Sequence, residues 1–199
     1  MAFEKTLLDR LLNVEISESA KDRFYAGSYN VFLEFFRNRI AIKAFEDNGA
    51  KIGVFLVYSW MARAVLEINS IQNLGPAKPA IMKACLGDIS IGELNLIKDF
   101  VGGSLIATSK FLHFLNPENF AIWDSNVAFA AYRFKHRYQY NSNAKYLEYL
   151  SDLKTLKLPD DLRKRVLLFL PNSSEARVKE FALFHLGITE QPRKTKLDR

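Results

Sequence analysis

From Glu93 to Arg133 the chain reads ELNLIKDFVGGSLIATSKFLHFLNPENFAIWDSNVAFAAYR. Apolar residues recur at helical spacing on both sides of Gly102 and Gly103, which predicts two helices joined by a glycine turn. Glycine suits such a turn because it takes positive φ without a Cβ clash. Ser104, directly after the turn, is placed to cap the second helix.

The other ends of these helices are also marked by polar residues and by proline. Ser90 with Glu93 matches a capping box ahead of the first helix. Pro117 cannot continue the second helix, which predicts a loop after it. Asp124 follows this loop at the position where a carboxylate caps a third helix, starting at Ser125.

A tight glycine turn between two helices can hold a DNA backbone. The N–H groups of the turn and of the second helix's first turn face a phosphate, and the helix dipole favours the anion. Gly102, Gly103 and Ser104 are therefore candidate DNA-backbone contacts, together with Thr108 and Lys110 in the helix that follows. A solvated lysine on the polar face of the helix is the alternative for Lys110.

The order of hairpin, loop and aspartate resembles the helix-hairpin-helix superfamily of base-excision DNA glycosylases. In that family an essential aspartate opens the helix after the hairpin. Gly103 takes the place of the hairpin's second glycine, and Asp124 lies twenty-one residues later. The resemblance covers Glu93 to Arg133. It implies an all-α, two-lobed domain with DNA as its partner.

Two positions depart from the family's pattern. Val101 stands where the hairpin's first glycine is expected, and Leu105 stands where members that also cleave the backbone carry a lysine. An aliphatic side chain cannot form a Schiff base. The resemblance therefore implies a monofunctional DNA glycosylase, which hydrolyses the N-glycosidic bond of a damaged or modified base. Glycosylases that excise hypermodified phage bases are also similar, which implies phage defence as an alternative to DNA repair.

Asp124 is the candidate catalytic residue. Hydrolysis of an N-glycosidic bond passes through a sugar with oxocarbenium character, and a carboxylate near C1′ can stabilise that cation and orient or deprotonate water. The alternative is that Asp124 only caps its helix. The two roles are compatible, because a cap position holds the carboxylate rigidly.

The base pocket has four candidate residues. A glycosylase takes its base out of the stack and holds it between flat or apolar side chains. Tyr58 and Trp60 on one segment, and Trp123 beside Asp124, are candidate walls, and Asn126 is a candidate contact to a base edge or a phosphate. The alternative for the aromatic residues is the core, because the chain has 16 Phe and 8 Tyr to bury.

Composition favours one globular unit with an apolar core: 49% of the 199 residues are apolar and 25% are charged. A single cysteine, Cys85, allows no internal disulfide and predicts a cytoplasmic protein. The start is not a signal peptide, and no apolar run is long enough to cross a bilayer. The net charge of +6 permits a nucleic-acid partner. We expect a monomer with no metal, no cofactor and no membrane contact.

Helical patterns cover the rest of the chain, which predicts about ten helices. Those outside the central segment are expected at 3–12, 17–25, 28–47 (closed by Asn48-Gly49), 52–66, a short one ending at Gly87 after a loop at Gly75-Pro76, 142–156, 159–170 and 173–187. The whole chain is expected to form one unit, with 29–115 as one lobe, 1–28 with 124–190 as the other, and 191–199 as a basic tail.

Two other functions fit the same patterns. A non-catalytic DNA-binding protein would use the hairpin without Asp124 chemistry, and a helical interaction protein would use it only as a turn between helices. The run from 133 to 138 alternates basic and aromatic residues. It is predicted either to flank a DNA channel or to form the solvated basic end of the helix that Asp124 begins.

Overall fold

The computed structural model describes residues 6–16, 20–41, 47–61 and 73–191, and within these ranges it contains helices and no strand. The all-α prediction is confirmed. The described helices are α1 (Thr6–Leu12), α2 (Ala20–Ala41), α3 (Asp47–Ser59), α4 (Leu74–Cys85), α5 (Ile91–Phe100), α6 (Leu105–Leu115), α7 (Ser125–Tyr132), α8 (Arg137–Tyr140), α9 (Asn143–Thr155), α10 (Asp160–Phe169) and α11 (Glu175–Glu190).

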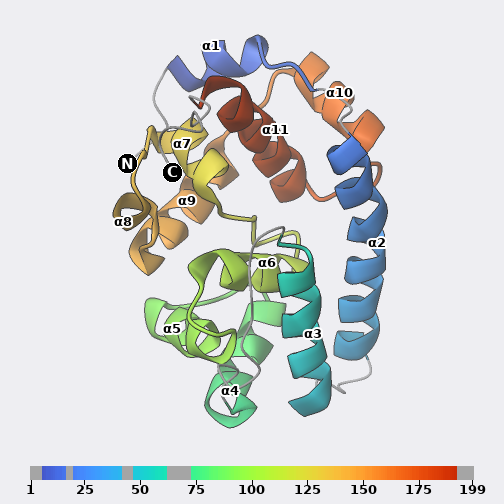
Figure 1. Cartoon of the computed structure of the whole chain (residues 1–199), viewed down its shortest axis with the longest axis vertical. Coiled ribbons are helices and arrows are strands. Elements are labelled where there is room, and N and C mark those ends of the chain that lie inside the picture. Colours follow the sequence, from blue (N-terminus) through green and yellow to red (C-terminus); the bar gives the residue numbers. More distant parts are fainter. Residues whose placement is uncertain (1–5, 17–19, 42–46, 62–72, 192–199) are drawn as a thin grey trace, which may run out of the picture.

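The helices gather toward the two ends of the long axis (Figure 1). Helices α3 to α6 lie toward one end, where α4 packs on α5 and α3 packs on α6. Helices α1 and α7 to α11 lie toward the other, where α11 packs on α7, α9, α10 and α1. Helix α2 runs along one side and packs on α6 and α3. The segment between α6 and α7 connects the two groups.

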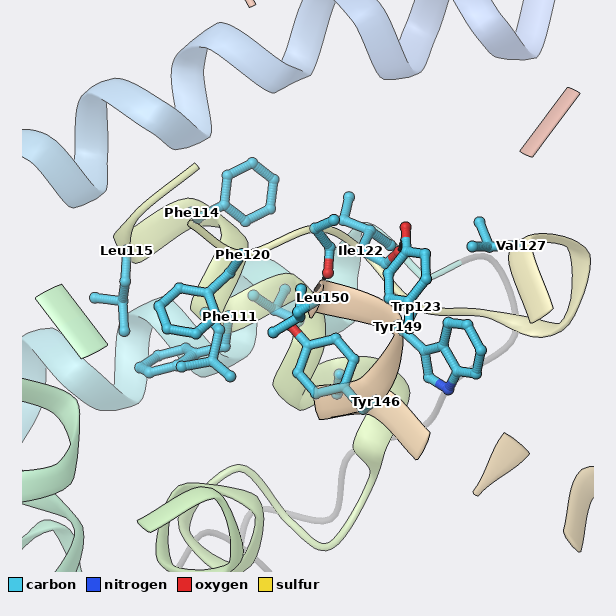
Figure 2. Packing of buried hydrophobic residues seen from close by; sticks show 14 of the residues in the cluster. Phe111, Phe114, Leu115, Phe120, Ile122, Trp123, Val127, Tyr146, Tyr149 and Leu150 are labelled. Carbon is cyan, nitrogen blue, oxygen red and sulfur yellow. Dashed lines mark hydrogen bonds between the residues drawn. The ribbon is translucent and has the colours of Figure 1, made fainter. Parts of the chain in front are cut away.

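Aromatic packing fixes this connecting segment. Figure 2 shows side chains of α6, of the segment itself and of α9 meeting in one buried cluster, among them Phe111, Phe114, Phe120, Ile122, Trp123, Tyr146, Tyr149 and Leu150. The Tyr146 hydroxyl donates to the Ala121 carbonyl at 3.1 Å, and the Tyr149 hydroxyl donates to the Ile122 carbonyl at 3.3 Å. The backbone that leads into Asp124 is therefore held by both packing and hydrogen bonds.

Three helix boundaries differ from the prediction because a glycine did not end a helix. The predicted break before Ser28 does not occur: α2 continues through Gly27, where an isolated glycine costs only about 1 kcal/mol. Asn48 and Gly49 do not close a helix but lie in the first turn of α3. Gly187 does not end α11, which continues to Glu190.

Other boundaries agree more closely. Helix α3 confirms the choice of helix over strand for the segment from Ile52 to Ser59, while 62–66 lie outside the described residues. Gly75 and Pro76 belong to the first turn of α4 and not to a loop, because proline lacks only an N–H that has no partner there. Gly87 ends that helix at φ 88°. None of the helices described combines the length and the hydropathy that a bilayer span requires.

Candidate functional site

The hairpin has the predicted form. Ser90 and Glu93 form a capping box at the start of α5, with bonds of 2.7 and 3.3 Å. Gly102 and Gly103 both take positive φ, 94° and 80°. The Ser104 hydroxyl accepts from the Ala107 N–H at 3.3 Å and so caps α6. Sequence reasoning therefore located both helix ends and the turn between them.

The glycine N–H groups of the turn are already used inside the turn. The Gly103 N–H donates to the Lys98 carbonyl at 2.8 Å, and the Gly102 N–H donates to the Asp99 carbonyl at 3.2 Å. A phosphate at this hairpin would instead meet the first N–H groups of α6, which have no partner within a helix. The turn borders an open groove of about 520 Å³ lined by Asn73, Pro76, Ala77, Leu96, Asp99, Phe100, Gly102 and Gly103.

Two of the predicted backbone contacts on α6 lie elsewhere than expected. Thr108 is fully buried and its hydroxyl donates to the Ser104 carbonyl at 2.7 Å, which corrects its assignment as a DNA contact. The Lys110 ammonium lies 5.1 Å from the centre of the Trp60 ring, so this lysine faces the interior of the site and not the hairpin. Leu105, at the position of the family's lysine, is buried in the core.

Asp124 caps α7 as predicted. Its Oδ1 atom accepts from the N–H groups of Asn126 and Val127, both at 2.9 Å. The residue before it is tied to α6, because the Trp123 N–H donates to the Ser109 hydroxyl at 3.0 Å. Ser109 lies six residues after Gly103, roughly 9 Å along the axis of α6. Helix α6 thus carries the hairpin at its start and the Asp124 backbone near its middle.

The electrostatics of Asp124 follow from its position. The residue keeps some exposed surface, but its carboxyl is buried, and this desolvation raises the pKa of the carboxyl. The Val127 and Asn126 N–H groups and the charges of Lys110 and Arg177 oppose the rise. Desolvation therefore disfavours the charged form of Asp124, while hydrogen bonds and nearby positive charges stabilise it. Such opposing effects are common for functional carboxylates.

Sequence reasoning missed Arg177 and Glu180 of α11. They form an ion pair in which the side chains are only 6% and 2% exposed. Burial, together with the Asp124 charge, raises the pKa of Glu180 to about 7, against the opposing charge of Arg177. We call Lys110, Asp124, Arg177 and Glu180 the charged cluster. A signal existed, because Arg177, Glu180, Phe181 and Phe184 follow the i, i+3, i+4, i+7 spacing of a buried helix face.

Aromatic rings surround the Arg177 guanidinium. Its central carbon lies 5.1 Å from the Tyr29 ring centre, 5.5 Å from that of Phe181 and 5.8 Å from that of Trp60. Cation–π contacts of this kind stabilise a positive charge that water does not reach. The charged cluster therefore has an aromatic side formed by α2, by Trp60 directly after α3, and by α11.

His113 of α6 lies near Arg177 of the charged cluster. It is fully buried, and its Nδ1 atom lies 2.7 Å from the Phe120 carbonyl, which makes Nδ1 the protonated nitrogen. Its Nε2 atom then accepts from the Tyr29 hydroxyl at 2.8 Å. Burial lowers the pKa of His113 to about 3, and Arg177 adds to the effect. The neutral histidine joins α2, α6 and the segment leading to Asp124.

The predicted aromatic pocket residues do not lie together: Trp60 lies beside the charged cluster, whereas Tyr58 and Trp123 lie elsewhere in the core. Trp60 is 4% exposed beside Lys110 and Arg177, with its indole N–H donating to the Ser28 hydroxyl at 2.9 Å. Tyr58 is buried and its hydroxyl donates to the Val101 carbonyl at 3.1 Å. Trp123 is fully buried and its indole N–H donates to the Tyr140 carbonyl at 2.8 Å. This placement corrects the assignment of Trp123 as a pocket wall, because its ring is a core residue.

The structure brings Asp124, Asn126, Lys110 and Trp60 to one region together with residues that were not predicted, whereas the hairpin glycines lie at the N-terminal start of α6. No protein-family model, curated protein or solved structure matches the chain.

Proposed function

We propose that this chain is a monofunctional DNA glycosylase, with Asp124 as its catalytic carboxylate, and that it removes a damaged or modified base. The supporting observation is the way in which Asp124 is held. Two backbone N–H groups bind Oδ1, the positive charges of Lys110 and Arg177 act on the carboxylate, and the residue as a whole keeps some exposed surface. Oδ2 is then the oxygen that would meet the sugar or the water.

The reaction needs one anion at a fixed position. The bond between C1′ and the base nitrogen breaks, and its electron pair leaves with the base, which gains a proton. The Asp124 carboxylate stabilises the positive charge that develops on the sugar and takes a proton from the water that attacks C1′. The phosphodiester backbone stays intact, since Leu105 cannot form the Schiff base that strand cleavage needs.

We assign the hairpin as the grip on the DNA backbone, on a two-lobed fold. The lobes are 29–115, which carries the hairpin, and 1–28 with 124–190. The N-terminal N–H groups of α6 would face a phosphate, and the groove at Gly102 and Gly103 gives room for a backbone beside them. Asp124 would act on a nucleotide flipped toward the segment that joins the lobes.

A panel of duplexes tests this function. Each duplex carries one altered base, either damaged (deaminated, alkylated or oxidised) or hypermodified as in phage DNA. Free base is measured by mass spectrometry, and abasic sites by their cleavage with alkali. We expect release of at least one base by the wild type, and not by Asp124→Asn, which keeps a good helix cap. The matched control Asp161→Asn, at an exposed position, should release base normally.

The class of base released separates the two biological roles. Release of damaged bases supports DNA repair, and release confined to hypermodified bases supports phage defence. No release by the wild type from any duplex would contradict the proposed activity.

A non-catalytic DNA-binding protein is the second candidate. One observation favours it: Trp60 and Trp123 are buried, so a flipped base would reach Trp60 only after neighbouring side chains move. This candidate predicts salt-dependent DNA binding that Asp124→Ala leaves unchanged, and no free base. A helical interaction protein, the third candidate, predicts no salt-dependent DNA binding.

A further inference from the structure

Two exposed aromatic rings lie stacked at the corner between α7 and α9. The ring centres of His136 and Tyr138 are 5.6 Å apart, and the ring planes differ by only 6°. Tyr138 is 78% exposed, although a tyrosine ring is usually at least half covered in a folded domain. This pair leaves aromatic surface in water, and no ring from another described element packs against it.

The backbone under this pair is firmly held. The N–H groups of Lys135 and His136 both donate to the side-chain oxygen of Gln139, at 2.8 and 2.9 Å. The Tyr140 carbonyl accepts from the buried indole of Trp123 at 2.8 Å. A surface fixed in this way loses little conformational entropy when a partner binds.

Positive charges alternate with the two rings. Lys135 and Arg137 are exposed, and neither forms an ion pair in the part of the chain that the structure describes. The neighbouring cations, in contrast, form ion pairs: Arg133 pairs with Glu190 at 2.8 Å, and Lys145 pairs with Glu148 at 2.8 Å. The sequence has no acidic residue from 125 to 147. The surface therefore suits an anionic partner.

Stacked rings beside free cations match a nucleotide better than an acidic peptide. A nucleobase offers a flat face of its own, and its phosphate offers the negative charge. Within a duplex both faces of a base are covered by its neighbours, so an unpaired or terminal base is the form that can stack on Tyr138.

We propose that His136 and Tyr138 form a stacking platform for an unpaired nucleotide of a nucleic-acid strand, with Lys135 and Arg137 contacting its phosphates. The platform deepens the proposed function and rests on its DNA partner, but it does not require catalysis by Asp124. The hydrogen bond between the Trp123 indole and the Tyr140 carbonyl joins the platform to Trp123, the residue that precedes Asp124.

Binding of two short fluorescent oligonucleotides tests the platform. One is single-stranded thymidine DNA, and the other has the same length but abasic sites in place of its bases; full-length protein carrying Asp124→Asn is used so that no base is removed. We expect Tyr138→Ala to weaken binding of the thymidine strand about 10-fold or more and to leave the abasic strand unchanged. The conservative Tyr138→Phe should bind as well as its parent.

The charged residues have a separate expected effect. Lys135→Ala with Arg137→Ala should weaken both strands and lower the salt dependence of binding, because phosphate contacts do not depend on the bases. Equal binding of the thymidine strand by Tyr138→Ala and its parent, equal losses on both strands, or displacement of the thymidine strand by polyglutamate at matched charge would overturn the platform. Base release from duplexes is scored separately, so failure of the platform and failure of the glycosylase are distinguishable.

Discussion

The charge of Glu180 depends strongly on its surroundings. Its carboxyl is buried beside Arg177, and the negative charge of Asp124 acts on it from the start of α7. Replacing a buried charge changes stability according to how strongly the charge is disfavoured by desolvation and favoured by its partners. The protonation of Glu180 near neutral pH therefore links the state of the charged cluster to the stability of the fold.

The raised pKa gives Glu180 a definite pH dependence. The folded protein binds a proton at Glu180 that the unfolded chain loses above pH 4.5, so this contribution is complete below pH 4.5 and disappears as pH rises through about 7. Its size is about 3 kcal/mol. Relative to wild type, Glu180→Gln should therefore be more stable at pH 8 than at pH 4.5 by about this amount. Urea unfolding at both pH values measures it; a difference that does not change with pH would contradict the raised pKa.

Asp99 is an obstacle at the proposed DNA grip. It lines the groove next to Gly102 and Gly103, where its negative charge would repel a phosphate. If the hairpin holds the DNA backbone, Asp99→Asn should tighten duplex binding about 2- to 5-fold at low salt. The matched control Asp88→Asn, exposed but outside this groove, should change it less. Fluorescence anisotropy measures both, and an unchanged affinity in Asp99→Asn would count against DNA at the hairpin.

At the scale of single residues, local signals predicted the caps but not the cluster. Ser104 and Asp124 bond to N–H groups two or three residues ahead, so their duty follows from neighbouring positions. Arg177 and Asp124 lie fifty-three residues apart, and their proximity depends on how α7 packs against α11. The site roles predicted for Trp123 and Thr108 were wrong because both side chains are buried. The sequence could not show this, since an aromatic ring or a hydroxyl suits a core as well as a surface site.

Helices α7 and α11 approach each other so closely that only glycine fits between them. A Cβ atom added to Gly187 would lie 2.1 Å from the Asn126 carbonyl oxygen and 2.9 Å from the Asn126 Cα. Those atoms belong to the first turn of α7, which Asp124 caps. Gly187 is therefore needed for a close approach inside a continuous helix. In the sequence, a glycine this near the end of a helical pattern fits a helix end as well as a close approach between two helices.

A pair of glycine substitutions tests this contact. Gly187→Ala should destabilise the fold by about 1 to 3 kcal/mol, because the gain in helix propensity is smaller than the overpacking against Asn126. Gly27→Ala is the matched control: it lies in α2 with nothing within 4 Å of the added Cβ, and it should stabilise the fold by up to about 1 kcal/mol. Thermal or urea unfolding measures both. A stabilised Gly187→Ala would contradict the close packing of α7 on α11.

The helical class and the order of most helices were predictable because most of them carry their own apolar spacing, whereas α8 and the continuity of α2 through Gly27 were not predicted. The helix end at Gly87 and the turn at Gly102 and Gly103 were predicted correctly, but Gly27, Gly49 and Gly187, which stood at expected helix boundaries, lie inside α2, α3 and α11. These cases differ in what surrounds the residue and not in the local sequence. Contacts between distant segments decide among them.

For the whole molecule, the proposed function depends on the relation between the hairpin and the segment that carries Asp124. Both are fixed to α6, the hairpin at its start and Asp124 through Ser109 near its middle. The order of these elements was visible in the sequence. The pairing of Asp124 with α11 was not, because it arises from the return of the chain's last described helix onto α7.

The most direct test of Asp124 chemistry is the single-turnover rate of base release from the duplex on which the wild type is active. Enzyme is in excess, and Asp124→Asn and Asp161→Asn are compared after circular dichroism has shown equal folding. We expect Asp124→Asn to be slower by about 100-fold or more, with Asp161→Asn unchanged and the product strand intact before alkali. Equal rates for Asp124→Asn and wild type would contradict a catalytic role for this carboxylate.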